Sequence, residues 1–143
     1  MLPADIKVGH ILRYSYLWHW QHLEGREEGD KDRPCLVLAL LTTLDDGTAV
    51  VRVLPITHTE SKNAEDALEI PAAVKNRLRL DEERSWIILT ESNRFAWPGP
   101  DLRPLDSADG YYGPLPPALF AEVKRRFVEL ARAGRHKAGA RTE

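Results

Sequence analysis

Short apolar runs separated by polar turns dominate the first two thirds of the chain. Residues 34–41 are almost wholly apolar, and a second run over 49–59 follows an Asp-Gly turn at 46–47. Apolar runs bounded by turn residues predict β-strands, and the Asp-Gly dipeptide predicts a hairpin between these two. The first run is nearly continuous, which indicates that both faces of its strand are covered.

Further strands and one short helix are predicted around this hairpin. Strand signals occur at 10–18, 68–71 and 85–92. Residues 71–80 predict a short helix, because a proline suits the first turn and apolar residues recur every four positions. The proline-rich segment 93–105 predicts an ordered irregular loop or a bent strand.

The pattern changes to a helical period from Pro117. Charged residues lie opposite an apolar stripe, which predicts an amphipathic helix. The stripe consists of Leu119, Phe120, Val123, Phe127 and Leu130.

These elements predict an α+β fold. We expect a small, strongly curved antiparallel sheet or barrel, with the short helix and the C-terminal amphipathic helix packed on it. Residues 1–134 form one domain, and the small polar residues 135–143 predict a disordered tail.

Composition narrows the class of protein. The single cysteine, Cys35, excludes a disulfide within one chain. The sequence lacks a signal-peptide pattern and an apolar run of the ~20 residues that a membrane span needs, which predicts a cytoplasmic protein without membrane contact. It also lacks a glycine-rich phosphate loop, zinc-ligand spacing and a nucleophile elbow, so we expect neither a metal nor another cofactor.

The net charge of -2 hides a basic C-terminal end. Residues 122–143 contain seven Lys or Arg against three Glu. Such an end can bind nucleic acid or an acidic partner, or it can be a solvated helix face followed by a tail. The charge alone does not distinguish these alternatives.

Polar residues at the strand ends are the candidates for chemistry. Arg33 precedes one strand of the hairpin, and Thr57, His58 and Thr59 close the other. The hairpin places Arg33 beside Thr57, and a guanidinium next to a hydroxyl suits a phosphate group. The alternative is that Arg33 pairs with a neighbouring carboxylate, Asp30 or Asp32.

Histidine is the residue type that ordinarily exchanges its proton near neutral pH, so His58 is a candidate base for a 2′-hydroxyl proton; the alternative is a plain exposed histidine. Arg94 and Trp97 can line the same groove, or Trp97 can anchor a loop.

Aromatic residues alternate along the first predicted strand. Tyr14, Tyr16, Trp18 and Trp20 would therefore share one face. Such a face can stack RNA bases, or it can be a core or dimer face.

Four motifs in order resemble the MazF/PemK growth-inhibitor toxins of the CcdB/Kid superfamily, over residues 7–105. They are VGHILRYSY (8–16), DRPCLVL (32–38), VVRVLPIT (50–57) and SWIILTESNRF (85–95). The predicted C-terminal helix also has a counterpart in that family.

The resemblance implies an SH3-like barrel, a homodimer and a small acidic antitoxin as partner. It implies a metal-independent endoribonuclease that cleaves single-stranded RNA, with Arg33 and Thr57 as the catalytic pair. His58 would assist. Contacts to RNA would come from Thr59, Arg94, Trp97, Tyr16 and Trp18.

The chain also departs from the family pattern. Residues 16–32 are longer and more aromatic, and Glu-Ser-Asn precedes Arg94 where the family has a glutamine. Residues 95–105 have no clear counterpart. These departures favour the alternative function, a non-catalytic SH3-like module that binds protein or nucleic acid.

Overall fold

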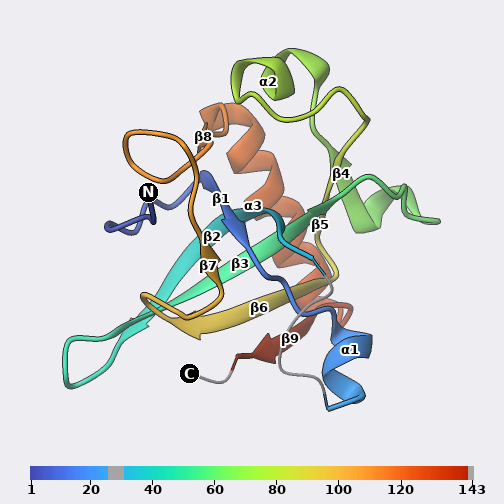
Figure 1. Ribbon diagram of the computed structural model, residues 1–143. Coiled ribbons are helices and arrows are strands. Elements are labelled where there is room, and N and C mark those ends of the chain that lie inside the picture. The colour runs from blue at the N-terminus through green and yellow to red at the C-terminus, as the bar shows by residue number, and fades with distance from the viewer. Residues whose placement is uncertain (26–30, 142–143) are drawn as a thin grey trace.

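A bent, mostly antiparallel sheet forms the body of the molecule (Figure 1). The computed structural model describes residues 1–25 and 31–141. Its strands are β1 (His10–Tyr14), β2 (Arg33–Thr43), β3 (Ala49–Thr57), β4 (Ala67–Glu69), β5 (Trp86–Ile88), β6 (Glu91–Ala96), β7 (Leu102–Arg103), β8 (Gly113–Pro114) and β9 (Lys137–Ala140).

Helices are few and lie around the sheet. Within the described ranges, each helix is too short or too polar to span a lipid bilayer. The helical segments are α1 (His19–Leu23), α2 (Ala72–Arg77), α3 (Pro117–Arg132) and a single 3₁₀ turn (Ala64–Asp66).

The predicted hairpin is confirmed as β2 and β3, which pair antiparallel around the Asp-Gly turn. Strand pairing follows the order β4-β5-β3-β2-β1-β7, and β8 also pairs with β1. The sheet does not close on itself, because β4 and β7 end this path. An α+β architecture with a curved antiparallel sheet is therefore present.

Pro55 lies where β3 changes partners. Residues 50–53 of β3 pair with β6, whereas residues 56–57 pair with β5. Proline has no N–H to donate, so it fits the break between the two ladders.

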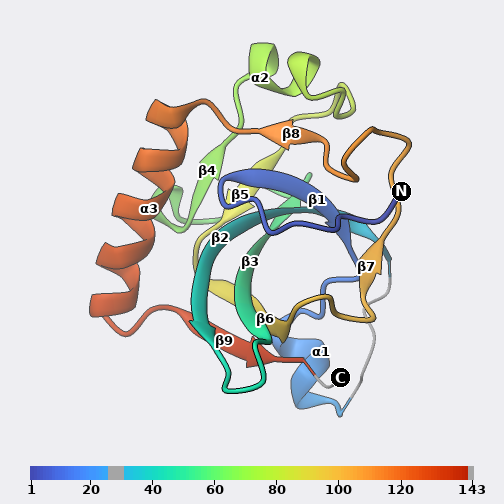
Figure 2. The same ribbon diagram turned by 90° about the vertical axis from the view of Figure 1, so that its left-hand side faces the viewer.

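Two apolar clusters cover the two faces of the sheet. Leu36 and Leu54 point toward α3, where they join Val123 of the helix. Val37 and Val53 belong to the second cluster, on the other face of the sheet. Figure 2 shows the curve of the sheet, with α3 packed on one side of it. The prediction that the strand over 34–41 is covered on both faces is confirmed for residues 35–38, which are all buried, and is wrong for Leu40 and Leu41, which are exposed.

The first strand ends earlier than predicted, at Tyr14 instead of Trp18. The side-chain amide of Asn93 accepts a hydrogen bond from the Leu17 N–H at 2.9 Å and donates one to the Leu17 carbonyl at 2.8 Å. These bonds replace a strand partner, and the chain then enters α1. The aromatic residues 14–20 therefore do not share one strand face.

The C-terminal segment differs from the predicted disorder. Residues 137–140 form β9, which pairs parallel with β6. Arg141 then packs into the interior, where its guanidinium lies 2.9 Å from the Asp101 carboxylate and donates to the Ser15 carbonyl at 2.6 Å. These partners come from distant segments, so a polar tail that looks disordered by composition is held by tertiary contacts. Residues 142–143 lie outside the described ranges.

His136 connects β9 to the sheet. Its Nδ1 lies 2.8 Å from the Leu89 carbonyl oxygen, and its Nε2 lies 2.8 Å from Ser92 Oγ and 3.3 Å from Arg52 Nη1. The Leu89 carbonyl accepts only from an N–H, so Nε2 of the neutral ring is left to accept. Burial lowers the pKa of His136. The hydrogen bond to the Leu89 carbonyl raises this pKa and the nearby charge of Arg52 lowers it, and the net effect is a lowered pKa.

We expect the stability of the fold to fall on acidification through His136. Its pKa in the folded chain is below the ordinary value of 6.5, so protons bind the unfolded chain more readily. The contribution of neutral His136 to the free energy of unfolding is complete above pH 6.5, and it is lost as the pH falls below 6.5. Urea unfolding at pH 7.5 and 5.5 measures the loss, and His136→Gln is expected to show a smaller one. An equal loss in the variant would contradict this.

Candidate functional site

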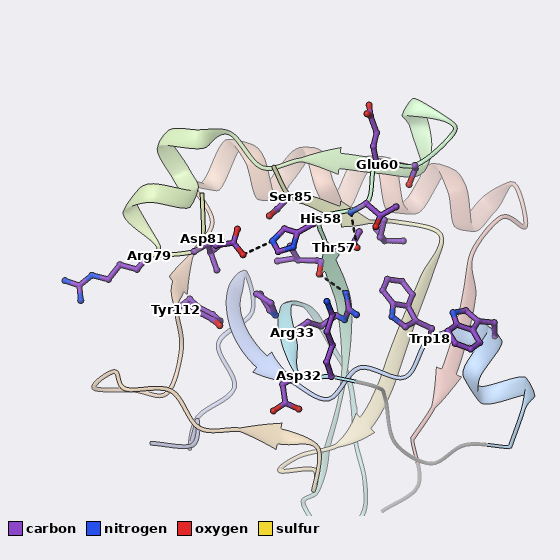
Figure 3. Close-up of a pocket in the computed structure, with 18 residues that line it drawn as sticks. Trp18, Asp32, Arg33, Thr57, His58, Glu60, Arg79, Asp81, Ser85 and Tyr112 are labelled. Atoms are coloured by element: carbon purple, nitrogen blue, oxygen red, sulfur yellow. Dashed lines mark hydrogen bonds and ion pairs between the residues drawn. The ribbon is translucent and has the colours of Figure 1, made fainter. Parts of the chain in front are cut away.

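A cavity of about 740 Å³ opens where the start of β2 meets the end of β3 (Figure 3). The segment after α2, the start of α1, the residues after β3 and Tyr112 add to its wall. The aromatic, charged and hydroxyl-bearing side chains that line the cavity include Trp18, Arg33, Thr57, His58, Asp81 and Tyr112.

Arg33 lies in the middle of the cavity. The β2–β3 register pairs Cys35 with Pro55, and continuing it by two residues places Arg33 opposite Thr57. The Arg33 guanidinium lies 4.8 Å from the centre of the Trp18 ring, and its Nη1 donates a long hydrogen bond of 3.5 Å to the Ile56 carbonyl. In Figure 3 the guanidinium points toward Thr57.

The predicted alternative for Arg33 was an ion pair with a neighbouring carboxylate. Asp32 instead pairs with Arg103 at 3.2 Å and approaches Arg13 at 4.0 Å. Figure 3 shows its carboxylate pointing away from the guanidinium of Arg33. The other alternative partner, Asp30, lies outside the described residues.

Thr57 is half-buried at the last position of β3. Its Oγ1 accepts a hydrogen bond from the Thr59 N–H at 3.2 Å. This bond orients the hydroxyl group and leaves its own proton available for a ligand oxygen. Thr59 itself also lines the cavity.

His58 is held between two carboxylates. Its Nε2 lies 2.7 Å from Asp81, and its Nδ1 lies 3.1 Å from Glu83. A neutral imidazole has one N–H, so only the doubly protonated ring donates to both carboxylates. In this arrangement His58 can donate a proton, which differs from the base predicted from its residue type.

The carboxylates that hold His58 were missed by the sequence analysis. Asp81 is itself bound by Lys75 of α2 at 2.9 Å. Burial acts to raise the pKa of Asp81, but the hydrogen bond from Lys75 and the charge of His58 outweigh it and lower the pKa. In the sequence, the only sign of Asp81 and Glu83 is that acidic residues are frequent in the polar segment 81–84.

Three predicted site residues lie elsewhere. Tyr16 is buried, with 1% of its surface exposed, and its hydroxyl donates to Glu91 at 3.1 Å, so it belongs to the core instead of a stacking face. Trp97 stacks on Phe95 at 5.9 Å and donates to the Ala4 carbonyl at 3.3 Å, which is the loop-anchor alternative. Arg94 belongs to β6 and does not line the cavity.

Other chemistries find little support within the described ranges. No group of three His, Cys, Asp or Glu residues there can hold a metal ion. Burial raises the pKa of the Cys35 thiol well above its usual range, so the reactive thiolate is disfavoured.

The arrangement can bind an anion next to a flat group. Arg33 supplies a forked cation, Thr57 a hydroxyl donor and His58 a proton donor, and Trp18 supplies an aromatic surface. Figure 3 shows Arg79 and Glu60 extending away from the centre. The inner wall therefore includes these donors and Asp81, one of the two acids that hold His58.

Comparison with protein-family models finds no match for the chain, and comparisons with curated proteins and with solved structures find none either.

Proposed function

We propose that the chain is a metal-independent endoribonuclease that cleaves single-stranded RNA, as the MazF/PemK toxins do. One observation carries the proposal: Arg33, Thr57 and His58 converge on one open cavity, with Trp18 beside them. A phosphodiester and an adjoining base present the anion and the flat surface that such a cavity suits.

The proposed reaction is attack of an RNA 2′-hydroxyl on its own phosphate. The new bond joins the 2′-oxygen to phosphorus, the bond to the 5′-oxygen breaks, and the products are a 2′,3′-cyclic phosphate and a 5′-hydroxyl. Arg33 stabilises the charge that grows on the phosphate, and Thr57 donates a hydrogen bond to a non-bridging oxygen. His58 protonates the leaving 5′-oxygen, while the 2′-hydroxyl proton passes to water.

The proposal includes the architecture and partners of that family. The bent antiparallel sheet and the packing of Val123 and Leu130 of α3 on it are compatible with an SH3-like barrel carrying a C-terminal amphipathic helix. A cytoplasmic homodimer that is inhibited by a small acidic antitoxin completes the proposal.

Incubation of the purified protein with long single-stranded RNA in EDTA tests the proposed activity. We expect fragments that end in a 2′,3′-cyclic phosphate and begin with a 5′-hydroxyl, at an undiminished rate in the chelator. Absence of cleavage by the wild-type protein would overturn the enzyme proposal.

Thr57→Val is expected to slow this cleavage by about 10-fold or more, because it removes one hydrogen bond to the phosphate while keeping the side-chain volume. The measurement is kcat/KM on a short RNA. Thr43→Val, the same change at the far end of β2, serves as the control and should retain the wild-type rate. Equal rates in both variants would remove Thr57 from the mechanism.

A non-catalytic binding module is the second candidate. The observation that favours it is the placement of Asp81 and Glu83 against His58, because their charge opposes a phosphate. Filter binding to RNA at rising salt distinguishes nucleic-acid binding from protein binding, since phosphate contacts weaken steeply with salt.

A further inference from the structure

Two arginines lie directly opposite each other on β3 and β6. The strand register pairs Arg52 with Arg94, and β6 in turn pairs with β9 (Figure 1). Opposed residues on adjacent strands have Cβ atoms about 4.5–5.5 Å apart. Both side chains leave the sheet on the side of α3, because the intervening Val51 and Val53 point to the other face.

Neither guanidinium meets a carboxylate within residues 1–25 and 31–141. Arg52 Nη1 lies 2.7 Å from Ser92 Oγ and 3.3 Å from His136 Nε2, and the group lies over the Phe127 ring at 5.6 Å. The Arg94 side chain has no hydrogen bond or ion pair to the described residues, although its Nε is buried.

Several arginines at other positions have acidic partners. Among the described residues these include Arg84–Glu69, Arg103–Asp32, Arg125–Glu122, Arg135–Asp66 and Arg141–Asp101. Arg52 and Arg94 differ from these because they lie directly opposite each other with no acidic partner among the described residues. Like charges directly opposite each other destabilise a sheet, and partial burial strengthens the repulsion. Consistently, burial and then the charge of Arg94 lower the pKa of Arg52.

The surroundings leave the pair accessible. Across the sheet the register runs from Ala39 on β2 through Arg52 and Arg94 to Ala140 on β9. Alanine is too short to cover a guanidinium, Ala140 is itself exposed, and Arg52 and Arg94 are both partly exposed. A small anion can therefore reach the exposed part of the pair, although the Nε of Arg94 is buried.

We propose that Arg52 and Arg94 form a phosphate-binding site on the α3 side of the sheet. The two planar forks donate hydrogen bonds to one phosphate group, and its charge relieves the repulsion between them. The site is separate from the cavity, which neither arginine lines, and it stands whether or not the chain cleaves RNA. Its ligand is either free phosphate or a phosphate of a nucleic-acid strand.

The test is thermal unfolding in sodium phosphate against sodium chloride of equal ionic strength. We expect the Tm of the wild-type chain to rise with phosphate, because a ligand that binds the folded state stabilises it. Arg94→Gln should raise the Tm in chloride, because the repulsion is removed, and should abolish the response to phosphate. Arg77→Gln on α2 is the control and should respond as the wild type does.

A direct readout is the ¹⁵N–¹H signal of Arg94 Nε, assigned by its loss in Arg94→Gln. We expect this signal to shift on addition of phosphate.

The uncleavable decamer oligo-dT distinguishes the two sources of the phosphate group, a free anion and a nucleic-acid strand. Binding of the decamer at least 10-fold tighter than inorganic phosphate, and dependent on Arg94, assigns the site to a nucleic-acid strand. Binding of phosphate alone assigns it to a free anion. An unchanged Arg94 signal and an unchanged Tm with both probes would overturn the proposal.

Discussion

Replacing Arg33 with alanine is expected to lower RNA cleavage by about 10²–10³-fold, with the larger effect on kcat. The guanidinium is the forked cation at the centre of the cavity, and its contribution grows as charge builds on the phosphate. Arg33→Lys should retain an intermediate rate, because an ammonium keeps the charge but loses the fork. The measurement is single-turnover cleavage of a short RNA at saturating protein.

Two controls make this result interpretable. Arg77→Ala removes an exposed arginine of α2 that lies outside the cavity, and it should cleave at the wild-type rate. Circular dichroism should show an unchanged fold in Arg33→Ala, whose lost contacts include one long hydrogen bond and the Trp18 ring. Wild-type cleavage by Arg33→Ala would exclude the proposed role of this residue.

Replacing Arg141 with methionine is expected to lower the free energy of unfolding by about 3–5 kcal/mol. The Arg141 side chain is 2% exposed and the Asp101 side chain 9%, so the variant leaves a buried carboxylate without its cation. Urea unfolding provides the measurement. The same loss corresponds to a fall in Tm of roughly 10 °C for a chain of this length.

Matched variants identify the cause of this loss. Asp101→Leu combined with Arg141→Met removes both charges and should recover most of the stability, because no buried charge then lacks a partner. Arg135→Gln in the same segment breaks an ion pair with Asp66 that is partly exposed, and it should cost less than about 1 kcal/mol. A small effect of Arg141→Met would show that β9 contributes little to the fold.

Local pattern was sufficient to predict several of the elements and part of the site. The Asp-Gly turn and the two apolar runs specify the β2–β3 hairpin, and this hairpin brings Arg33 and Thr57 into one cavity. The proline at 71 and the apolar spacing after it likewise predict α2. Such features depend on residues close in the chain, so a sequence pattern contains them.

The remaining part of the site depends on contacts between distant segments. The partner of His58, Asp81, is 23 positions away in a segment whose composition indicates only a polar surface. Tyr16 is taken into the core by a hydrogen bond to Glu91, which is 75 positions away. A stacking residue and a core residue have the same aromatic pattern, so the sequence could not distinguish them.

The sequence by itself determined the β2–β3 hairpin, the helices α2 and α3, and the placement of Arg33 beside Thr57, because each follows from the spacing of nearby residues. The tertiary structure decided the placement of His58 between two carboxylates, the burial of Tyr16, the ordering of β9 by Arg141 and the opposition of Arg52 and Arg94. The physical reason is that burial and charge pairing depend on which segments meet, and the chain brings those segments together only when it folds.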